Sequence, residues 1–457
     1  MKGKEITMTS GSLYKNIFIF SVPLMLSNML QVLFNISDIA VVGRFAGAAA
    51  LGEVGSCTIL VSLFTGLLIG MGGGINAVAA RYMGARDTEK LKKAVHSAFL
   101  ISVIFGLLVM TIGLAVVKEI LVLLDTKNEL LDGAVLYIRV YLLGTPALAL
   151  YNYGNGILSA AGDSKRPLFY LSAAGVVNIA LNLFFVIVFN MGVLGVALAS
   201  IISQYLSAFL IIMRLIKCKK DYSLTASQMR IDLPVSKNIA IIGISAGLQN
   251  AIFALANLFI QSAVNSFDTI MVEGNSAAAN ADTLIYDIMA AFYVACTSFM
   301  AQNYGAGKKE RVMQSYKISL LYSFAVAAVA GVLLLVFGRE FLSLFTTEEA
   351  VIEAGIKRLT IMASAYCISA FMDCSIAASR GLGETVVPTI AVVIGSCVLR
   401  IVWIYTIFAY FNTIPSLYLL YPFSWAVTAV FEIAYFRIIY RKKVLSLPDN
   451  PATKSSL

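Results

Sequence analysis

The feature that most constrains the fold of this chain is a series of twelve apolar stretches separated by short polar segments. A transmembrane helix needs about 20 predominantly apolar residues, and a helix satisfies all of its backbone hydrogen bonds without water. The pattern therefore predicts an all-α polytopic membrane protein with twelve transmembrane helices. We place these helices near residues 17–43, 53–80, 94–117, 133–160, 168–189, 193–215, 239–266, 276–302, 315–337, 354–379, 388–411 and 417–439.

Composition supports a membrane protein and argues against several other classes. Only 13% of the 457 residues are charged, whereas soluble domains have about 25%. The net charge of +9 does not indicate nucleic-acid binding, because the basic residues lie in short segments between apolar stretches. The six cysteines and the single histidine show no metal-binding spacing, and the sequence has no phosphate-binding glycine loop. We therefore expect no enzyme activity, no ATP-driven pumping by this chain and no cofactor.

The distribution of lysine and arginine predicts the orientation of the chain in the membrane. With the N-terminus in the cytoplasm, 26 of the 34 basic residues fall in cytoplasmic segments and seven, including Arg358, in outer ones. Arg400 alone falls deep inside a predicted helix, far from both of its ends. This bias and the even number of spans predict two cytoplasmic termini. Residues 1–14 are polar and lack the apolar core of a signal peptide, so we expect no cleavage there.

The longest loop divides the chain into two halves that resemble each other. We expect an N-terminal bundle in residues 1–216, a cytoplasmic linker in 217–237 and a C-terminal bundle in 238–457. The motif Arg-Tyr-Met-Gly-Ala-Arg at 81–86 ends the second span, and Gln-Asn-Tyr-Gly-Ala-Gly at 302–307 ends the eighth. The two motifs therefore occupy equivalent places in the two halves.

Two further matches support an internal repeat. The turns at 162–167 and 383–388 are separated by the same offset as those two motifs, and Asn28 and Asn35 recur as Asn250 and Asn257 at an offset only one position longer. Because each half has six spans, the repeats have the same orientation in the membrane. The sequence therefore predicts two six-helix bundles related by a pseudo-two-fold axis along the membrane normal. This is a transporter architecture with the substrate path between the bundles.

The first predicted span, Ile17 to Arg44, carries a polar stripe. Its members, spaced three, four and three residues apart, are Asn28, Gln31, Asn35 and Asp38. These spacings place all four side chains on one face of a helix. An ionisable group inside a membrane normally faces a bundle interior or a water-filled cavity, so we interpret Asp38 as functional. The amides are open to two interpretations, as functional groups or as hydrogen-bonding contacts between helices.

Three polar residues of the first half lie at similar predicted depths. Asp38, Asn182 and Ser200 are each six or seven residues from the outer end of their span, or about 10 Å at 1.5 Å per residue. Asn178 lies one turn deeper on the same face as Asn182. A carboxylate with two amide oxygens and a hydroxyl suits a hard cation such as sodium, or a proton on Asp38. The alternative is four separate packing contacts.

The second half has ionisable groups of its own. Asp287 and Arg400 lie at similar depths, which predicts a buried and structural pair. Asp373 precedes Arg380 by seven residues and either lines an inward vestibule or contacts that arginine. In the first half, Pro23 interrupts the first span about four helical turns before Asp38. We expect a kink there that could transmit a change of charge at Asp38 to the cavity.

Aromatic and methionine side chains are numerous enough to line a substrate cavity. The chain has 27 phenylalanines, 21 tyrosines and 16 methionines. Most are ordinary core or lipid-facing residues. A minority facing a cavity would suit flat, apolar cations through apolar contact and cation–π attraction.

Several short motifs give the chain a family resemblance over residues 15 to 443. They are Ser-Asp-Ile-Ala-Val-Val-Gly at 37–43, Gly-Asp-Ser at 162–164, Gln-Ser-Ala-Val-Asn-Ser-Phe at 261–267, Gln-Asn-Tyr-Gly-Ala-Gly at 302–307 and Arg-Gly-Leu-Gly at 380–383. At these positions among twelve spans, the chain resembles the multidrug and toxic compound extrusion (MATE) family. The resemblance implies antiport of organic cations and other drugs against sodium ions or protons. It also implies two six-helix lobes in a V that opens alternately to each side.

The resemblance also implies roles for single residues. Asp38 matches the family's first-span carboxylate, which is implicated in cation coupling, and Asn178 matches an asparagine of the amino-terminal cation site. Asn182 and Ser200 stand where related members have an aspartate and a threonine. Sodium would then be held by Asp38, Asn178 and Asn182. The cation site of the second lobe in another branch is not carried over, because the seventh span has no acidic residue.

The sequence thus predicts a bacterial inner-membrane antiporter of drugs and organic cations that works as a monomer. The candidates for the substrate cavity are Gln31, Asn35, Asn257, Gln261 and Asp373. One alternative is a flippase for a lipid-linked saccharide from the same wider superfamily, which tends to have more spans or a strongly cationic cavity. Another is a membrane scaffold or receptor that transports nothing, which would not need an intramembrane carboxylate among amides.

Overall fold

The computed structural model describes residues 5–124 and 126–448, and these form helices and connecting turns without any β-strand. The long helices are α1 (Leu13–Phe45), α2 (Gly47–Ala85), α3 (Thr88–Leu123), α6 (Lys165–Leu183), α7 (Gly192–Lys217), α8 (Leu233–Val264), α9 (Thr269–Gly305), α10 (Lys309–Ser343), α11 (Glu349–Gly381) and α16 (Leu420–Ile439). The shorter helices are α4 (Asn128–Leu142), α5 (Thr145–Ala160), α12 (Val386–Val392), α13 (Leu399–Trp403), α14 (Ala409–Phe411) and α15 (Ile414–Tyr418). The π-helical turns are η1 (Phe184–Val188), η3 (Val393–Val398), η4 (Ile404–Phe408) and η5 (Tyr440–Leu445), and η2 (Ala226–Gln228) is a 3₁₀ turn.

The predicted fold class is confirmed. Among the described residues, eleven helical segments are long and apolar enough to cross a membrane, and the bent pair α4 and α5 makes a twelfth. The helices extend beyond the apolar stretches, as α3 does at both ends of the predicted span 94–117. The extensions carry polar residues such as Lys92 and Glu119, which can lie at the level of the lipid headgroups rather than in the hydrocarbon.

The fourth predicted span, 133–160, is not one straight helix. It is broken into α4 and α5, which meet at an angle of 45°. Pro146 has no N–H to donate to the carbonyl of Leu142, so the helical ladder cannot continue there. The hydroxyl of Thr145 donates to that carbonyl instead, at 2.7 Å. The predicted span is therefore present as a bent pair of helices, and the physical reason for the bend is the missing donor.

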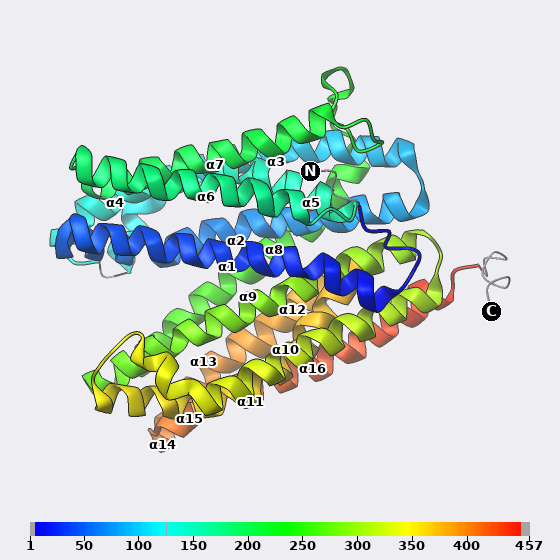
Figure 1. The fold of residues 1–457 in the computed structure, drawn as a ribbon. Helices are drawn as coiled ribbons and strands as arrows, with labels where there is room; N and C mark the ends of the chain where they lie inside the picture. Colours follow the sequence, from blue (N-terminus) through cyan, green and yellow to red (C-terminus); the bar gives the residue numbers. More distant parts are fainter. Residues whose placement is uncertain (1–4, 125, 449–457) are drawn as a thin grey trace. The chain divides into compact units, whose positions relative to one another are not determined.

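The chain forms two compact units, each with its own helices (Figure 1). Unit 1 contains Met1–Ile6 and Leu26–Ala251, and unit 2 contains Thr7–Met25 and Ile252–Leu457. Helix α1 therefore begins in unit 2 and ends in unit 1, whereas α8 begins in unit 1 and ends in unit 2. The expected division at 216 and 238 is a different partition of the chain, by repeat rather than by compactness, and stays a prediction.

Each unit has its own hydrophobic core. Buried side chains from α2, α4 and α7 build that of unit 1, among them Leu60, Ile138 and Val196. In unit 2, residues of α9, α11 and α15 do the same, among them Met289 and Tyr366. Each half of the molecule can therefore hold a polar site on a rigid scaffold.

The backbone repeats the pattern found in the sequence. Three pairs of residues with positive φ are separated by the offset of the sequence repeat, to within one position: Arg86 and Gly307, Gly162 and Gly383, and Asn190 and Asn412. The same turn bonds also recur. The amide of Asp87 donates to the carbonyl of Tyr82 at 3.1 Å, as the amide of Lys308 does to that of Asn303 at 2.9 Å. A left-handed residue with such a bond is a Schellman-type helix end, so α2 and α9 end in the same way.

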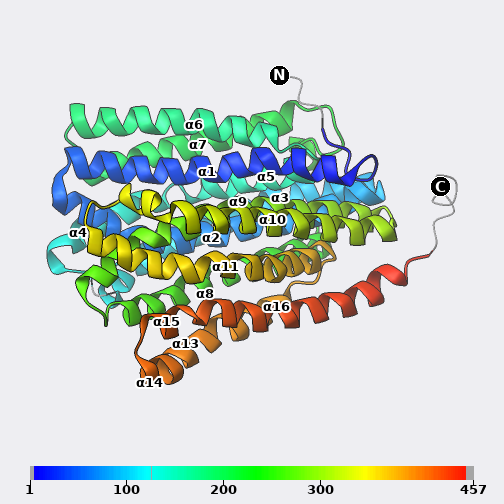
Figure 2. The same cartoon turned by 60° about the horizontal axis from the view of Figure 1, so that its bottom comes forward.

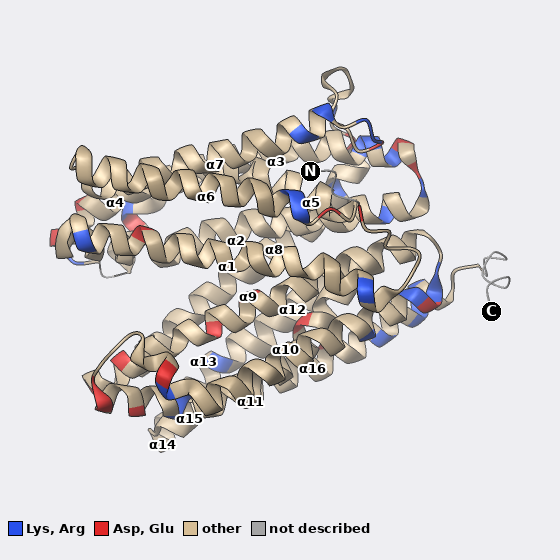
Figure 3. Ribbon diagram, viewed as in Figure 1, with Lys and Arg blue, Asp and Glu red and all other residues tan. Residues whose placement is uncertain are grey.

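Basic residues gather at one end of unit 1. Figure 3 shows lysine and arginine where α2 meets α3 and where α5 meets α6, at the end that also holds the loop between α7 and α8. The turn after α2 carries the N-cap Asp87, whose carboxylate accepts from the amide of Lys90 at 3.0 Å. This hydrogen bond lowers the pKa of the Asp87 carboxyl below its ordinary value. The charged end fits the segments that the sequence predicts to be cytoplasmic.

Candidate functional site

The second half of α1 brings Asp38 against α6 and α7. These three helices run side by side in both views (Figures 1 and 2). The side-chain amide of Asn182 donates from Nδ2 to Oδ1 of Asp38, and the hydroxyl of Ser200 donates to Oδ2 at 3.4 Å. Both oxygens of the carboxylate thus face neutral donors.

Asn178 joins this cluster through Asn182. The two residues are one turn apart on α6, and Nδ2 of Asn182 also donates to Oδ1 of Asn178 at 3.2 Å. Asn182 is fully buried and Asn178 nearly so. The three residues that the sequence places at similar depths therefore form one hydrogen-bonded group with Asn178, and we call this group the Asp38 cluster.

One oxygen of the Asp38 cluster has no partner. Within the part of the chain that the structure describes, no donor reaches Oδ1 of Asn182. A buried acceptor without a hydrogen bond costs about 1–3 kcal/mol, so its presence calls for a reason. Such an oxygen can accept a hydrogen bond from a protonated carboxyl group, or it can bind a cation.

The donor set of the Asp38 cluster fits a small monovalent cation. Carboxylate, amide and hydroxyl oxygens are hard ligands, which suit sodium better than a transition metal. In residues 5–124 and 126–448, no three acidic, histidine or cysteine side chains gather as they would around a divalent metal. A proton on Asp38 fits the same group, because its neighbours are neutral.

Two tyrosines of α4 belong to the surroundings of Asp38, and sequence reasoning missed them. The charge of Asp38 acts on the phenol groups of Tyr137 and Tyr141, which are both buried. Their rings stack with centroids 6.2 Å apart, and the hydroxyl of Tyr141 lies 3.4 Å from that of Thr65. The only signal in the sequence was their position before Pro146, where the broken helix ends.

The other cavity candidates of α1 and α8 lie on exposed faces. Gln31, Asn35 and Asn257 are exposed, and Gln261 donates to Oδ1 of Asn265 at 2.9 Å along α8. Polar side chains on the open face of a membrane helix favour contact with water over contact with lipid. Asn250 instead donates to the carbonyl of Gly66 at 3.1 Å, which is a helix contact within unit 1. The substrate-binding role of the four candidates stays a prediction.

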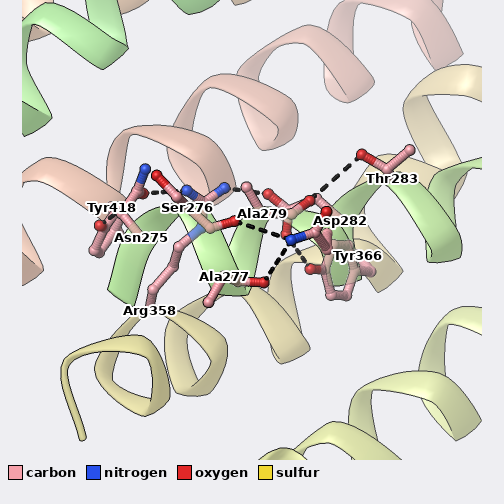
Figure 4. A network of polar contacts seen from close by, with 10 residues as sticks. Asn275, Ser276, Ala277, Ala279, Asp282, Thr283, Arg358, Tyr366 and Tyr418 are labelled. Carbon is pink, nitrogen blue, oxygen red and sulfur yellow. Dashed lines mark hydrogen bonds and ion pairs between the residues drawn. The ribbon is translucent and has the colours of Figure 1, made fainter. Parts of the chain in front are cut away.

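Unit 2 holds a closed polar network (Figure 4). Arg358 of α11 forms an ion pair with Asp282 of α9 and donates to the side-chain oxygen of Asn275. The hydroxyl of Tyr366 donates to the same Asp282, and that of Tyr418 donates to Asn275 at 2.9 Å. Only 4% of Arg358 is exposed, so this arginine, which the sequence places among the outer basic residues, is buried inside the protein. One face of α11 is buried against α9. Counting basic residues in the segments between spans does not show which face of a helix is buried.

The remaining candidates of unit 2 have different surroundings. Asp373 is buried and accepts a hydrogen bond from the Tyr286 hydroxyl at 2.6 Å. Arg400 is buried on α13, and its Nε donates to the hydroxyl of Ser424 at 3.1 Å. Asp287 lies half-buried on α9, and the predicted pairing with Arg400 is not among the ion pairs that the described residues form.

Pro23 lies buried inside α1. It belongs to unit 2, three positions before Leu26, where α1 passes into unit 1. Its expected role as a bending point stays a prediction.

Comparison with known proteins points to one family. The family model called MatE matches residues 23–184 and again residues 246–406. Two matches of one model agree with the internal repeat.

Two relatives from Bacillus subtilis match most of the chain. "Probable multidrug resistance protein YoeA" is 24% identical over 444 residues, which cover 95% of this chain and 96% of the relative. "Probable multidrug resistance protein YpnP" is 28% identical over 371 residues, which cover 79% and 81%.

The fold is also found in solved structures. The crystal structure of MATE in complex with MaL6 superimposes with a TM-score of 0.90 at 22% identity. The match covers 97% of this chain and 100% of that one. At this identity, the likeness shows the fold.

Proposed function

We propose that this chain, which belongs to the MatE family, exports drugs and other organic cations across a membrane in exchange for sodium ions or protons. The relatives named for multidrug resistance support the substrate class. The family and these relatives are transporters rather than enzymes.

The observation that carries this proposal is the Asp38 cluster. A carboxylate within a membrane helix costs several kcal/mol unless it has a role and partners. Here the partners of Asp38 are an amide and a hydroxyl, and neither carries a charge. The group can therefore gain and lose a cation or proton without breaking an ion pair.

The chemistry of proton exchange follows from the donors. An ionised Asp38 accepts from Asn182 Nδ2 and Ser200 Oγ. After proton uptake, one carboxyl oxygen becomes a donor and needs an acceptor. Rotation of the Asn182 amide would turn its unpartnered Oδ1 toward that proton. In this way, protonation of Asp38 on α1 would change the hydrogen bonds of Asn182 on α6.

Sodium would use the same oxygens. Asp38 would supply the charge, Asn182 its free Oδ1, and Asn178 and Ser200 the remaining oxygens. With a single carboxylate, the site would bind sodium more weakly than one with two, because affinity rises with ligand charge.

Exchange would alternate between two access states. The two six-helix bundles of residues 1–216 and 238–457, joined by the linker 217–237, would open to one side at a time. Helix α1 contributes to both compact units, so a change at Asp38 could pass along it to the segment beyond Pro23. Gln31, Asn35, Asn257, Gln261 and Asp373 would contact the substrate.

The protein would act as a monomer in the bacterial inner membrane with both termini in the cytoplasm. The excess of lysine and arginine in the segments between the second and third, fourth and fifth, and sixth and seventh spans supports this orientation.

The test is efflux of ethidium from proteoliposomes under separately imposed sodium and proton gradients. We expect one gradient to drive efflux, and we expect Asp38→Asn to reduce that efflux to the level of empty liposomes. If neither gradient drives efflux of any cation in a panel, the drug-export proposal is wrong.

The flippase alternative receives less support from the site. A flippase for a lipid-linked saccharide tends to have a strongly cationic cavity. Arg358 and Arg400 are the buried arginines among the described residues of unit 2, and Asp282 neutralises Arg358, which leaves Arg400. A scaffold that transports nothing would leave the Asp38 cluster without a purpose.

A further inference from the structure

Arg400 is the strongest candidate for a binding group that the coupling mechanism does not use. It lies on α13, a short helix between the π-helical turns η3 and η4. Only 3% of the residue is exposed. π-Helical turns in membrane helices often mark functional positions, because they shift the side chains that follow.

The guanidinium of Arg400 is poorly satisfied by the protein. It has five N–H donors, and only Nε has a hydrogen-bond partner in the described chain, the hydroxyl of Ser424. None of the described carboxylates forms an ion pair with it. A buried cation without a counter-charge is costly, so an anionic partner from outside the chain would stabilise it.

Arg358 shows what a satisfied arginine looks like in the same unit. It is as buried as Arg400, but it pairs with Asp282 and with the amide oxygen of Asn275. A structural role therefore comes with acidic and amide partners in this protein. Arg400 lacks such partners.

Aromatic rings cover the flat guanidinium of Arg400. Its central carbon lies 4.8 Å from the centroid of the Tyr421 ring, 5.7 Å from that of Trp425 and 5.8 Å from that of Phe253. Rings over the faces hold the charge by cation–π attraction. The terminal N–H groups at the edge can then form two parallel bonds to a carboxylate or phosphate.

The acidic side chain whose charge acts on Arg400 has a hydrogen-bond partner of its own. Asp373 acts on Arg400 through its charge, but its carboxylate accepts from the Tyr286 hydroxyl at 2.6 Å. The Tyr286 ring lies 6.5 Å from that of Trp425. The rings of Trp425 and Tyr286 therefore lie between Arg400 and Asp373.

We propose that Arg400, walled by Phe253, Tyr421 and Trp425, binds the carboxylate or phosphate group of an aromatic compound that the protein transports. This rests on the proposed export function and names a second substrate class for it, namely ring compounds with an oxyanion. The rings contact the flat part of the ligand, and the guanidinium edge binds its charge. A purely cationic drug gains nothing from Arg400.

Tryptophan fluorescence offers a direct test, because the chain has two tryptophans and one of them is in the site. The Trp403 ring packs at a tilt against Phe423, with centroids 5.0 Å apart, and Trp403→Phe leaves Trp425 as the sole reporter. The purified full-length variant in detergent is titrated with 2-naphthoate, methyl 2-naphthoate and 2-naphthyl phosphate, with correction for inner-filter absorbance.

We expect 2-naphthoate to bind at least about tenfold more tightly than its uncharged ester, because only the acid forms charge-assisted hydrogen bonds with the guanidinium. Adding Arg400→Gln should remove this preference. Arg400→Lys should retain part of it, because lysine keeps the charge but cannot form two parallel hydrogen bonds to one oxyanion. Binding of naphthyl phosphate decides whether phosphate is accepted along with carboxylate.

Equal affinity for the acid and the ester in the Trp403→Phe protein would overturn the proposal, and this comparison needs no change at Arg400. So would an unchanged preference in Arg400→Gln. Binding is measured without a gradient, so a failure of ethidium efflux would count against the export function and leave this measurement intact.

Discussion

Asp38 in unit 1 and Asp282 in unit 2 are both carboxylates inside membrane helices, but they have different partners. Asp282 pairs with the guanidinium of Arg358 and accepts from Tyr366. Within the part of the chain that the structure describes, Asp38 accepts only from the amide of Asn182 and the hydroxyl of Ser200. A carboxylate paired with arginine already has its charge balanced by the protein, whereas one among neutral donors can exchange its counter-ion. The comparison teaches that the charge of the neighbours separates a structural carboxylate from a coupling one.

The largest expected effect separates the two sites by function. Asp38→Asn should lose gradient-driven efflux of ethidium almost completely, because an amide cannot take up a proton or balance sodium. The variant should unfold within a few degrees of the parent in detergent, because Asn182 and Ser200 retain a side chain to bond. Efflux in proteoliposomes and thermal unfolding are measured on the same preparation. A variant that transports normally would remove Asp38 from the mechanism.

The second effect is on stability and belongs to unit 2. Asp282→Asn leaves Arg358 buried without its counter-charge, and breaking a buried pair costs about 3–5 kcal/mol. We expect a large fall in thermal stability and loss of efflux only in proportion to unfolded protein. The matched control is the double variant Asp282→Asn and Arg358→Met, which should recover much of the loss. If Asp282→Asn is as stable as the parent and fails to transport, the two sites do not differ as we argue.

A smaller effect should appear in the affinity of the Asp38 cluster for sodium. Asn182→Asp adds a second carboxylate beside Asp38, and affinity for a hard cation rises with the number of charged ligands. We expect the sodium concentration for half-maximal efflux to fall by about tenfold. Ser200→Thr, which keeps the hydroxyl, is the control and should leave this concentration unchanged. An unaltered sodium dependence in Asn182→Asp would mean that residue 182 does not face the ion.

Much of the fold could be predicted because hydropathy reports burial in lipid directly. The twelve spans and the repeat followed from apolar length and from motif spacing. The sequence could predict that Asp38, Asn182 and Ser200 come together, because they lie at similar depths in the membrane. Residues at the same depth can meet whether their helices run parallel or antiparallel. The break between α4 and α5 did not follow, because apolar content continues through Pro146 while the hydrogen-bond ladder does not.

Other features could not be predicted because they depend on which face of a helix is covered. Arg358 lies near the start of α11, where the sequence suggests a polar helix end, but α9 covers its side chain. Tyr137 and Tyr141 are two aromatic residues among many, and nothing in their spacing indicates that the charge of Asp38 acts on them. The division of α1 between two units also has no signal in its sequence.

The smallest expected effect concerns α1 itself, which passes from unit 2 near Pro23 to the Asp38 cluster of unit 1. Proline inside a helix removes a backbone bond and favours a bend, so Pro23→Ala should make bending harder. We expect the initial rate of efflux to fall by less than about tenfold, or about 1.4 kcal/mol, with ethidium affinity changed even less. The control is Pro167→Ala in the first turn of α6, where proline needs no donor, and it should transport normally. Equal rates in Pro23→Ala and the parent would show that α1 transmits the change at Asp38 without bending at this residue.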